Sequence, residues 1–370
     1  MKRKVVLLLV TLLATNFAMA QLTKVGEAAF KGAKNSAKGV STVVNKGAVE
    51  NAVRGAATSE DQMVIQDLFV MMKEDRYLRE ILINQAFKTK SMNMLHALLN
   101  DPITSDLAWS DASRKDKDFL QKIIQGGSFP TRAALWYPSV HGKQDVVNLF
   151  AREGKLSASL KYEMLYNALR YDHFAVASDL LEKFHVDINP EAKTFVRYGK
   201  DGGCGNSDDI LYSLGSYGSI SKKGKALRFA LENGANPNLV YKDTGNSIYF
   251  QLLLDGKFGG LKMFREYGAK LEGDMLAKAN LLLHEKINDE GFTRALIDAG
   301  ADPHFKLDGI TPQERAVLAS YREQSPKEKE QIDGVVKFYE DLSNGKVEPY
   351  YNKKGEPLYW EEREPEPWER

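Results

Sequence analysis

Apolar residues recur at helical spacing in short runs along this 370-residue chain, and three consecutive runs end in the same way. The runs are residues 226–233, 261–267 and 292–299, and the pairs that follow them are Gly234-Ala235, Gly268-Ala269 and Gly300-Ala301. The three glycines are 34 and 32 residues apart. A period near 33 residues is typical of helix pairs that stack one on the next. The pattern therefore predicts an all-α repeat array, a solenoid of stacked helical hairpins.

The same pattern, extended in both directions, predicts eight helix pairs between residues 59 and 345. The second helix of each pair is expected to end near Asn100, Gly127, Gly154, His185, Gly234, Gly268, Gly300 and Gly345. Glycine closes helices because it enters the left-handed conformation at little cost, which we expect at Gly154, Gly234, Gly268, Gly300 and Gly345. The longest interval, between His185 and Gly234, holds an insertion near residues 189–207.

Helix starts are also legible from capping boxes. Ser59 with Gln62, Thr311 with Glu314, and Ser325 with Glu328 have the spacing at which a hydroxyl and a carboxylate or amide cap the same first turn. Pro312 and Pro326 follow two of these caps at the first helical position, where a missing N–H costs nothing.

Residues 1–20 have the pattern of a secretory signal peptide. A basic start at residues 2–4 precedes an apolar stretch at 5–13 and the small-residue sequence Ala18-Met19-Ala20. The stretch is about half of the roughly 20 apolar residues that a spanning helix needs, so a retained anchor is the lesser alternative. The chain lacks an Asn-x-Ser/Thr acceptor, which favours a periplasmic location, with secretion as the alternative.

Two flanking segments differ from the repeats in composition. Residues 21–58 carry six Lys/Arg against two Glu on a Gly/Ala-rich background, which indicates a leader or spacer or a weak contact with an anionic membrane surface. Residues 346–370 form an aromatic and acidic tail, which we interpret as a cover for the last repeat, a disordered tail or a partner-binding strand. The overall net charge of +1 gives no reason to expect a nucleic-acid partner.

The Gly-Ala-Asn/Asp-Pro sequence, followed by a turn and a Ser/Thr that opens a helix, resembles the ankyrin repeat. The best matches run over residues 234–248 and 300–312, and include Pro237, Pro303 and the Thr311-Pro312 helix opener. The family's Leu-His-x-Ala signature survives only as Leu95-His96-Ala97 and Leu283-His284-Glu285. The resemblance implies a scaffold that binds another protein through its hairpin tips and inner helices.

On this sequence the tips fall at residues 239–242 and 305–307. Exposed aromatic residues are common anchors at protein interfaces. We therefore expect partner contacts from Tyr241, Lys242, Asp243, Phe305 and Lys306. The alternative is that both rings pack against the adjacent hairpin.

Candidate chemistry is sparse. Cys204, the single cysteine, cannot form an internal disulfide and lies in a Gly-rich stretch. Ser219 and Lys222 have the spacing of a Ser-x-x-Lys pair, but no Lys-Thr-Gly partner accompanies them. The six histidines show no metal-ligand spacing. We therefore expect no catalytic residue, metal or cofactor.

These observations favour an exported, non-catalytic protein-binding scaffold, in its sharper form an inhibitor or immunity factor of the periplasm. A secreted effector that binds a host protein is the alternative. A hydrolase that uses Cys204 or the Ser-Lys pair is a third and weaker hypothesis.

Overall fold

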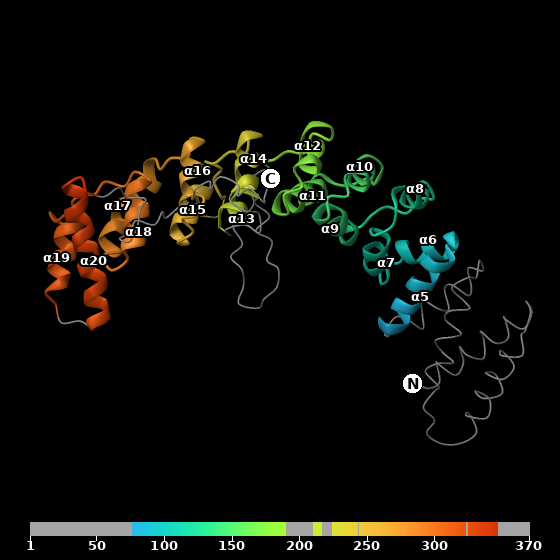
Figure 1. Ribbon diagram of the computed structural model, residues 1–370, viewed down its shortest axis with the longest axis horizontal. Coiled ribbons are helices and arrows are strands. Elements are labelled where there is room, and N and C mark those ends of the chain that lie inside the picture. Colours follow the sequence, from blue (N-terminus) through green and yellow to red (C-terminus); the bar gives the residue numbers. More distant parts are fainter. Residues whose placement is uncertain (1–75, 190–209, 217–223, 243, 323–324, 347–370) are drawn as a thin grey trace, which may run out of the picture. The chain divides into compact units, whose positions relative to one another are not determined.

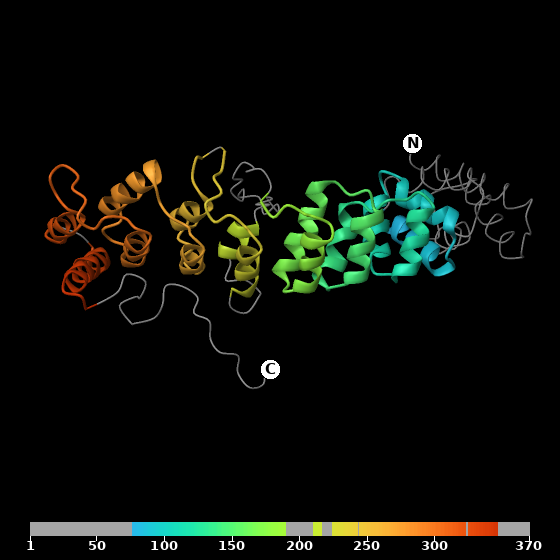
Figure 2. The same ribbon diagram turned by 90° about the horizontal axis from the view of Figure 1, so that it is seen from above.

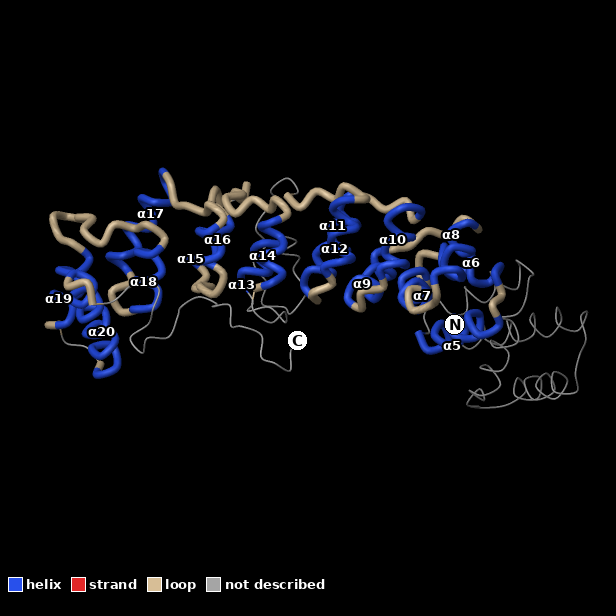
Figure 3. Tube along the Cα trace, turned by 45° about the horizontal axis from the view of Figure 1, so that its top comes forward, coloured by secondary structure: helices blue, strands red, loops and turns tan. Residues whose placement is uncertain are grey.

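The structure, a computed structural model, describes residues 76–189, 210–216, 224–242, 244–322 and 325–346. Within these residues every regular element is a helix (Figure 3). Two isolated β-bridges pair Val240 with Ser247 and Leu307 with Ile310. The predicted all-α class is thus confirmed for this part of the chain. The predicted segments 1–20 and 21–58, the insertion and the tail lie outside it, apart from single residues at their edges.

The chain divides into two compact units, Met1–Leu160 and Lys161–Arg370. The described helices of the first unit are α5 (Arg76–Thr89), α6 (Met92–Asn100), α7 (Ser105–Ala112), α8 (Lys117–Gln125), α9 (Arg132–Val140) and α10 (Gln144–Glu153). Within this unit α5 lies against α6 and α9 against α10, while α7 packs on α9 and α8 on α10 (Figure 1). Its core includes Trp109, whose ring meets that of Phe150 edge to face at 6.2 Å.

The second unit is built from a longer series of helices, and α11 crosses the division between the units. They are α11 (Ala158–Arg170), α12 (Phe174–Glu182), α13 (Ile210–Ser216), α14 (Lys225–Glu232), α15 (Ile248–Leu254), α16 (Leu261–Glu266), α17 (Gly273–Glu285), α18 (Glu290–Asp298), α19 (Pro312–Ser320) and α20 (Pro326–Ser343). Here α13 packs on α14 and α15, α15 on α16, α17 on α18 and α19, and α18 and α19 on α20 (Figures 1 and 2).

The ends of the even-numbered helices α6 to α20 fall close to the eight predicted points. Gly234, Gly268, Gly300 and Gly345 take the left-handed conformation, with φ of 88°, 88°, 107° and 65°. The prediction for Gly154 is wrong: its φ is −76°, and Lys155 takes the left-handed conformation instead with φ of 52°. Gly154 is buried, and a Cβ there would lie 2.8 Å from the ring of Pro130, so close packing rather than a positive φ requires glycine at this position.

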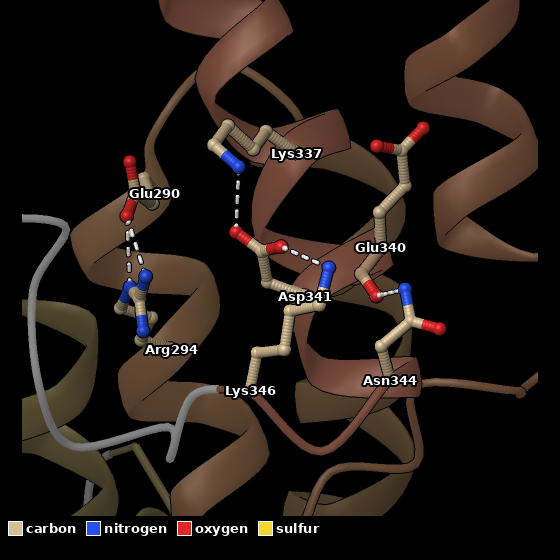
Figure 4. Close-up of polar contacts among 7 residues, drawn as sticks. All are labelled: Glu290, Arg294, Lys337, Glu340, Asp341, Asn344 and Lys346. Carbon is tan, nitrogen blue, oxygen red and sulfur yellow. Dashed lines mark hydrogen bonds and ion pairs between the residues drawn. The ribbon is translucent and has the colours of Figure 1, made fainter.

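The last described helix, α20, packs one apolar face on α18 and α19. Val335 and Tyr339 of α20 form a buried cluster with Ala316 of α19. Arg294 of α18 is 2% exposed, with its guanidinium 4.1 Å from the centre of the Phe338 ring. Its Nε and Nη2 donate to Glu290 at 2.9 and 2.8 Å (Figure 4).

The outward face of α20 is polar. Lys337 donates to Asp341 at 2.8 Å, and Lys346 lies 3.9 Å from the other oxygen of the same carboxylate (Figure 4). This hydrogen bond lowers the pKa of Asp341 and raises that of Lys337. A terminal helix with one apolar and one charged face is what a stack of helix pairs needs at its end.

Candidate binding surfaces

In the second unit an asparagine side chain links one junction to the next, a junction being the segment between one helix pair and the following pair. Asn189 Nδ2 donates to the Gly234 carbonyl at 2.8 Å, and the Asn236 N–H donates to Asn189 Oδ1 at 2.6 Å. One amide group therefore satisfies both a carbonyl and an N–H of the neighbouring junction.

Asn238 repeats this pair of bonds one junction later. Its Nδ2 donates to the Gly268 carbonyl at 2.8 Å, and its Oδ1 accepts the Lys270 N–H at 3.1 Å. The next junction has Glu272 at the corresponding position, and there Asn280 of α17 accepts the Asp302 N–H at 2.8 Å. The Asn189 and Asn238 side chains thus make the same pair of hydrogen bonds, and the next link is made differently.

The predicted repeat-motif residues support these junctions and offer little contact area. Buried members of the motif are Ala235, Pro237, Ala269, Ala301 and Pro312, while Pro303 and Thr311 are half-buried. Thr311 and Glu314 form the predicted capping box, and the backbone N–H of Thr311 lowers the pKa of Glu314 by hydrogen bonding to it. We therefore assign the motif a structural role.

The first predicted tip does not present its aromatic ring. Tyr241 is 4% exposed, so the prediction of an exposed contact there is wrong. The cause is local: Val240 and Ser247 form a β-bridge, and consecutive residues of such an extended segment point to opposite sides. Val240 is therefore exposed, and Tyr241 points inward. Lys242 is exposed, and Asp243 lies outside the described residues.

The ring of the second predicted tip packs on a helix of the preceding pair. The half-buried Phe305 ring meets His284 of α17 edge to face at 6.0 Å, and His284 Nε2 lies 3.0 Å from the Phe305 carbonyl oxygen. Lys306 is exposed. The two tips therefore contribute lysines to the surface, whereas their rings serve the fold.

Sequence reasoning missed a surface of the first unit that combines aromatic and basic side chains. It lies where the helices of one pair are joined, at the α5–α6, α7–α8 and α9–α10 turns. We name it the aromatic–basic edge and define it by Phe87, Arg114, Lys115, Trp136, Tyr137 and His141.

Ring contacts make this edge continuous. Lys115 Nζ lies 5.1 Å from the centre of the Phe87 ring, and Arg114 Cζ lies 5.1 Å from the centre of the Tyr137 ring. His141 stacks on Tyr137 with ring centres 4.1 Å apart, and its ring meets that of Trp136 at 6.2 Å. Three helix pairs therefore share one row of rings and cations. A sequence signal existed in the Trp136-Tyr137 pair, but their neighbours come from other turns.

Trp136 is 50% exposed. Tyr137 is half-buried and Phe87 is buried, whereas Arg114, Lys115 and His141 are exposed. Trp and Arg are the residue types that most often dominate binding energy at protein interfaces. The arrangement can therefore bind a partner by an apolar contact surrounded by cationic donors.

The junctions of the first unit are held by individual side chains. His96 Nδ1 lies 2.7 Å from Ser128 Oγ, and a Cβ on Gly126 would lie 2.1 Å from His96 Nε2. Burial lowers the pKa of His96, because desolvation disfavours the charged imidazolium. His96, one of the two remnants of the family signature, thus joins α6 to the junction after α8.

The candidate chemical groups are not brought together in the described structure. Cys204, Ser219 and Lys222 lie outside the described residues. Among the residues that are described, no cluster of His, Cys, Asp or Glu has the arrangement of a metal site. Among the described helices, none combines the length and the apolar composition that a membrane span needs.

Comparison with known proteins adds no relative. No protein-family model matches the chain, and no curated protein or solved structure matches it either. The resemblance to the ankyrin repeat therefore stays a prediction from the quoted motifs.

Proposed function

We propose that this chain is an ankyrin-like solenoid that binds another protein through the aromatic–basic edge. The observation that carries the proposal is the continuity of that edge, in which a half-exposed tryptophan and five other side chains from three helix pairs form one row. Helix pairs of a stack contact mainly their neighbours, and such stacks provide long surfaces for partners.

The ankyrin-like architecture is supported by the junctions. Asn189 and Asn238 make equivalent pairs of hydrogen bonds at successive junctions, as expected where one structural unit repeats. Gly234 and Gly268 share the same φ of 88°. The proposal includes export to the periplasm, on the signal-peptide pattern of residues 1–20, and a role as an inhibitor or immunity factor.

Site-specific photo-cross-linking in the cells that make this protein tests the proposal. A photoreactive phenylalanine analogue replaces Trp136 in the full chain, and a matched variant carries it at Ile103, which is 43% exposed in the same unit but lies in a junction. We expect a discrete cross-linked protein from position 136 and not from position 103. The yield should fall when Arg114 and Lys115 are both changed to Glu. Equal yields at both positions, or no product at position 136, would contradict the proposal.

A further inference from the structure

We propose that the aromatic–basic edge recognises an acidic, extended segment of the partner protein that carries one large apolar side chain. This inference rests on the proposed function and adds the chemistry of the partner. Carboxylates of the segment pair with the cations of the edge, and the apolar side chain packs on Trp136.

The first support is an excess of cations without acidic partners. The three turns that form the edge contain Lys90, Arg114, Lys115 and Lys143 against one acid, Asp116. Asp116 Oδ1 is already engaged, since it accepts the Phe119 N–H at 2.9 Å. Among the described residues none of these four cations forms an ion pair. A surface of this kind attracts anionic groups and speeds their encounter.

The second support is that the rings hold the cations in place. Arg114 lies on the Tyr137 ring, and Lys115 lies on the Phe87 ring. Cations that are held over aromatic rings lose less conformational freedom when they bind a carboxylate. The edge is therefore organised before the partner arrives.

The same contacts favour a protein over a single-stranded nucleic acid. Nucleic-acid surfaces of this type stack successive bases on free aromatic faces. Here cations already lie on Phe87 and Tyr137, which leaves Trp136 as the exposed large apolar ring of the edge. One free ring among several cations suits a single apolar anchor flanked by carboxylates.

The size of the segment follows from the spacing of the helix pairs. Packed helices lie about 8–10 Å apart, so three successive turns span roughly 20 Å. An extended chain covers about 3.3 Å per residue. The segment should therefore be about six to eight residues long.

Fluorescence anisotropy with the full chain tests this inference. The probe is a labelled octapeptide of six Glu, one Trp and one Leu, and the control probe has Gln in place of every Glu. We expect the acidic peptide to bind at least tenfold more tightly than the neutral one at low salt, with affinity falling as salt rises. Equal binding of the two peptides would overturn the inference.

Variants of the chain locate the binding. The double change Arg114→Glu with Lys115→Glu should weaken binding of the acidic peptide by at least tenfold, and Trp136→Ala by several-fold. The charge-matched control is Lys257→Glu with Lys278→Glu, two exposed lysines of the second unit, which should change affinity by less than twofold. Trp136→Phe separates loss of the anchor from loss of fold, because it should restore most of the affinity. Loss of binding in the control variant alone would place the site on the second unit and overturn the inference.

Two further probes address the other classes of partner. A fifteen-nucleotide thymidine strand, or vesicles containing phosphatidylglycerol, that bound more tightly than the acidic peptide and lost binding in the Arg114 and Lys115 variant would overturn the inference. Failure of the acidic peptide, with the cross-link at position 136 intact, would leave the proposed function standing and reject the partner chemistry alone.

Discussion

The two units build similar helix pairs but hold their junctions by different means. In the second unit, glycines in the left-handed conformation end the helices, and the side chains of Asn189 and Asn238 bond to the backbone of the next junction. In the first unit, Gly127 and Gly142 also take the left-handed conformation after helices, but the junctions are joined by contacts between individual side chains such as His96 and Ser128. Helix pairing therefore does not depend on the Gly-Ala motif, because the apolar faces of the helices supply it in both units.

Helix starts differ in the same direction. In the second unit Ser247, Asp289, Thr311 and Ser325 each cap the helix that follows with a side-chain hydrogen bond. In the first unit Asp116 caps α8, whereas Ser91, Thr104 and Thr131 precede helices without such a bond. His173, Gly224, Gly260 and Glu272 of the second unit also precede helices without such a bond, so side-chain caps are more frequent in the second unit but are not general there.

The turns within helix pairs differ in charge between the two units. Those of the first unit are basic and carry the aromatic–basic edge. The described turns of the second unit contain Lys257, Lys286 and Arg322 against Asp172, Asp255 and Asp289, which is balanced. Regular junctions and the proposed binding surface thus occur in different units of the same chain.

The largest effect is expected where the first unit packs most tightly. Gly126→Ala should lower the free energy of unfolding of the first unit by about 1–3 kcal/mol, because the added methyl collides with the His96 ring. The fluorescence of buried Trp109 during urea unfolding measures it. Combining the change with His96→Ala should recover part of the loss, since the clash is then gone.

The neighbouring Gly127 offers a matched control. Its φ is 95° and a Cβ there would meet nothing within 4 Å, so Gly127→Ala carries only a conformational cost of about 1–2 kcal/mol. His96→Ala should leave that cost unchanged. Recovery in both double variants would show that the clash is not the cause.

A smaller effect is expected from the repeated asparagines of the second unit. Asn238→Ala removes two hydrogen bonds between exposed groups, which should cost about 1–2 kcal/mol in total. Hydrogen exchange should quicken at the Lys270 amide and leave the first unit unchanged. Asn233→Ala serves as the control, because its side chain bonds only within its own helix end, to the Phe229 carbonyl. Unchanged exchange at Lys270 would contradict a linking role for Asn238.

The sequence predicted the helices well because their signals are local. Apolar spacing, the glycines at 234, 268 and 300, and the Thr311 capping box each depend on residues within one or two turns of each other. The prediction for Gly154 assumed a helix-ending glycine, whereas the glycine there is required by a non-local neighbour, because an added Cβ would meet Pro130. Even so, the helix ends beside Gly154, since the left-handed residue is Lys155, one position later.

Binding residues were harder to predict because exposure is a tertiary property. Tyr241 was expected at the surface from its place in a turn, yet the β-bridge beside it turns its ring inward. Arg114, Tyr137 and Phe87 are up to 50 positions apart, and no local pattern relates them. The spacing of Trp136 from the other apolar residues of its helix is compatible with a core position.

Helix caps provide a third comparison of the two units, with an effect on the free energy of unfolding of about 1 kcal/mol. Thr311→Val removes the hydroxyl that accepts the Glu314 N–H and should destabilise the second unit by about that amount. Thr131→Val in the first unit should be neutral or slightly stabilising, because its hydroxyl is buried without a hydrogen-bond partner among the described residues. Thermal unfolding of the two variants measures the difference, and an equal loss in both would contradict it.

The smallest and most specific effect is a pH dependence confined to the first unit. Burial lowers the pKa of His96 in the folded state, so the unfolded chain binds more protons between the folded pKa and its ordinary value of about 6.5. The stability that His96 contributes is therefore fully present above about pH 6.5 and is lost as pH falls through and below that value. Urea unfolding followed by Trp109 fluorescence between pH 8 and 5 should show this decline. His96→Gln should flatten the decline, whereas the same change at the exposed His141 should not. A decline of equal size in the His96→Gln variant would assign the pH dependence to other groups, and the contact with Ser128 would then be only a packing contact.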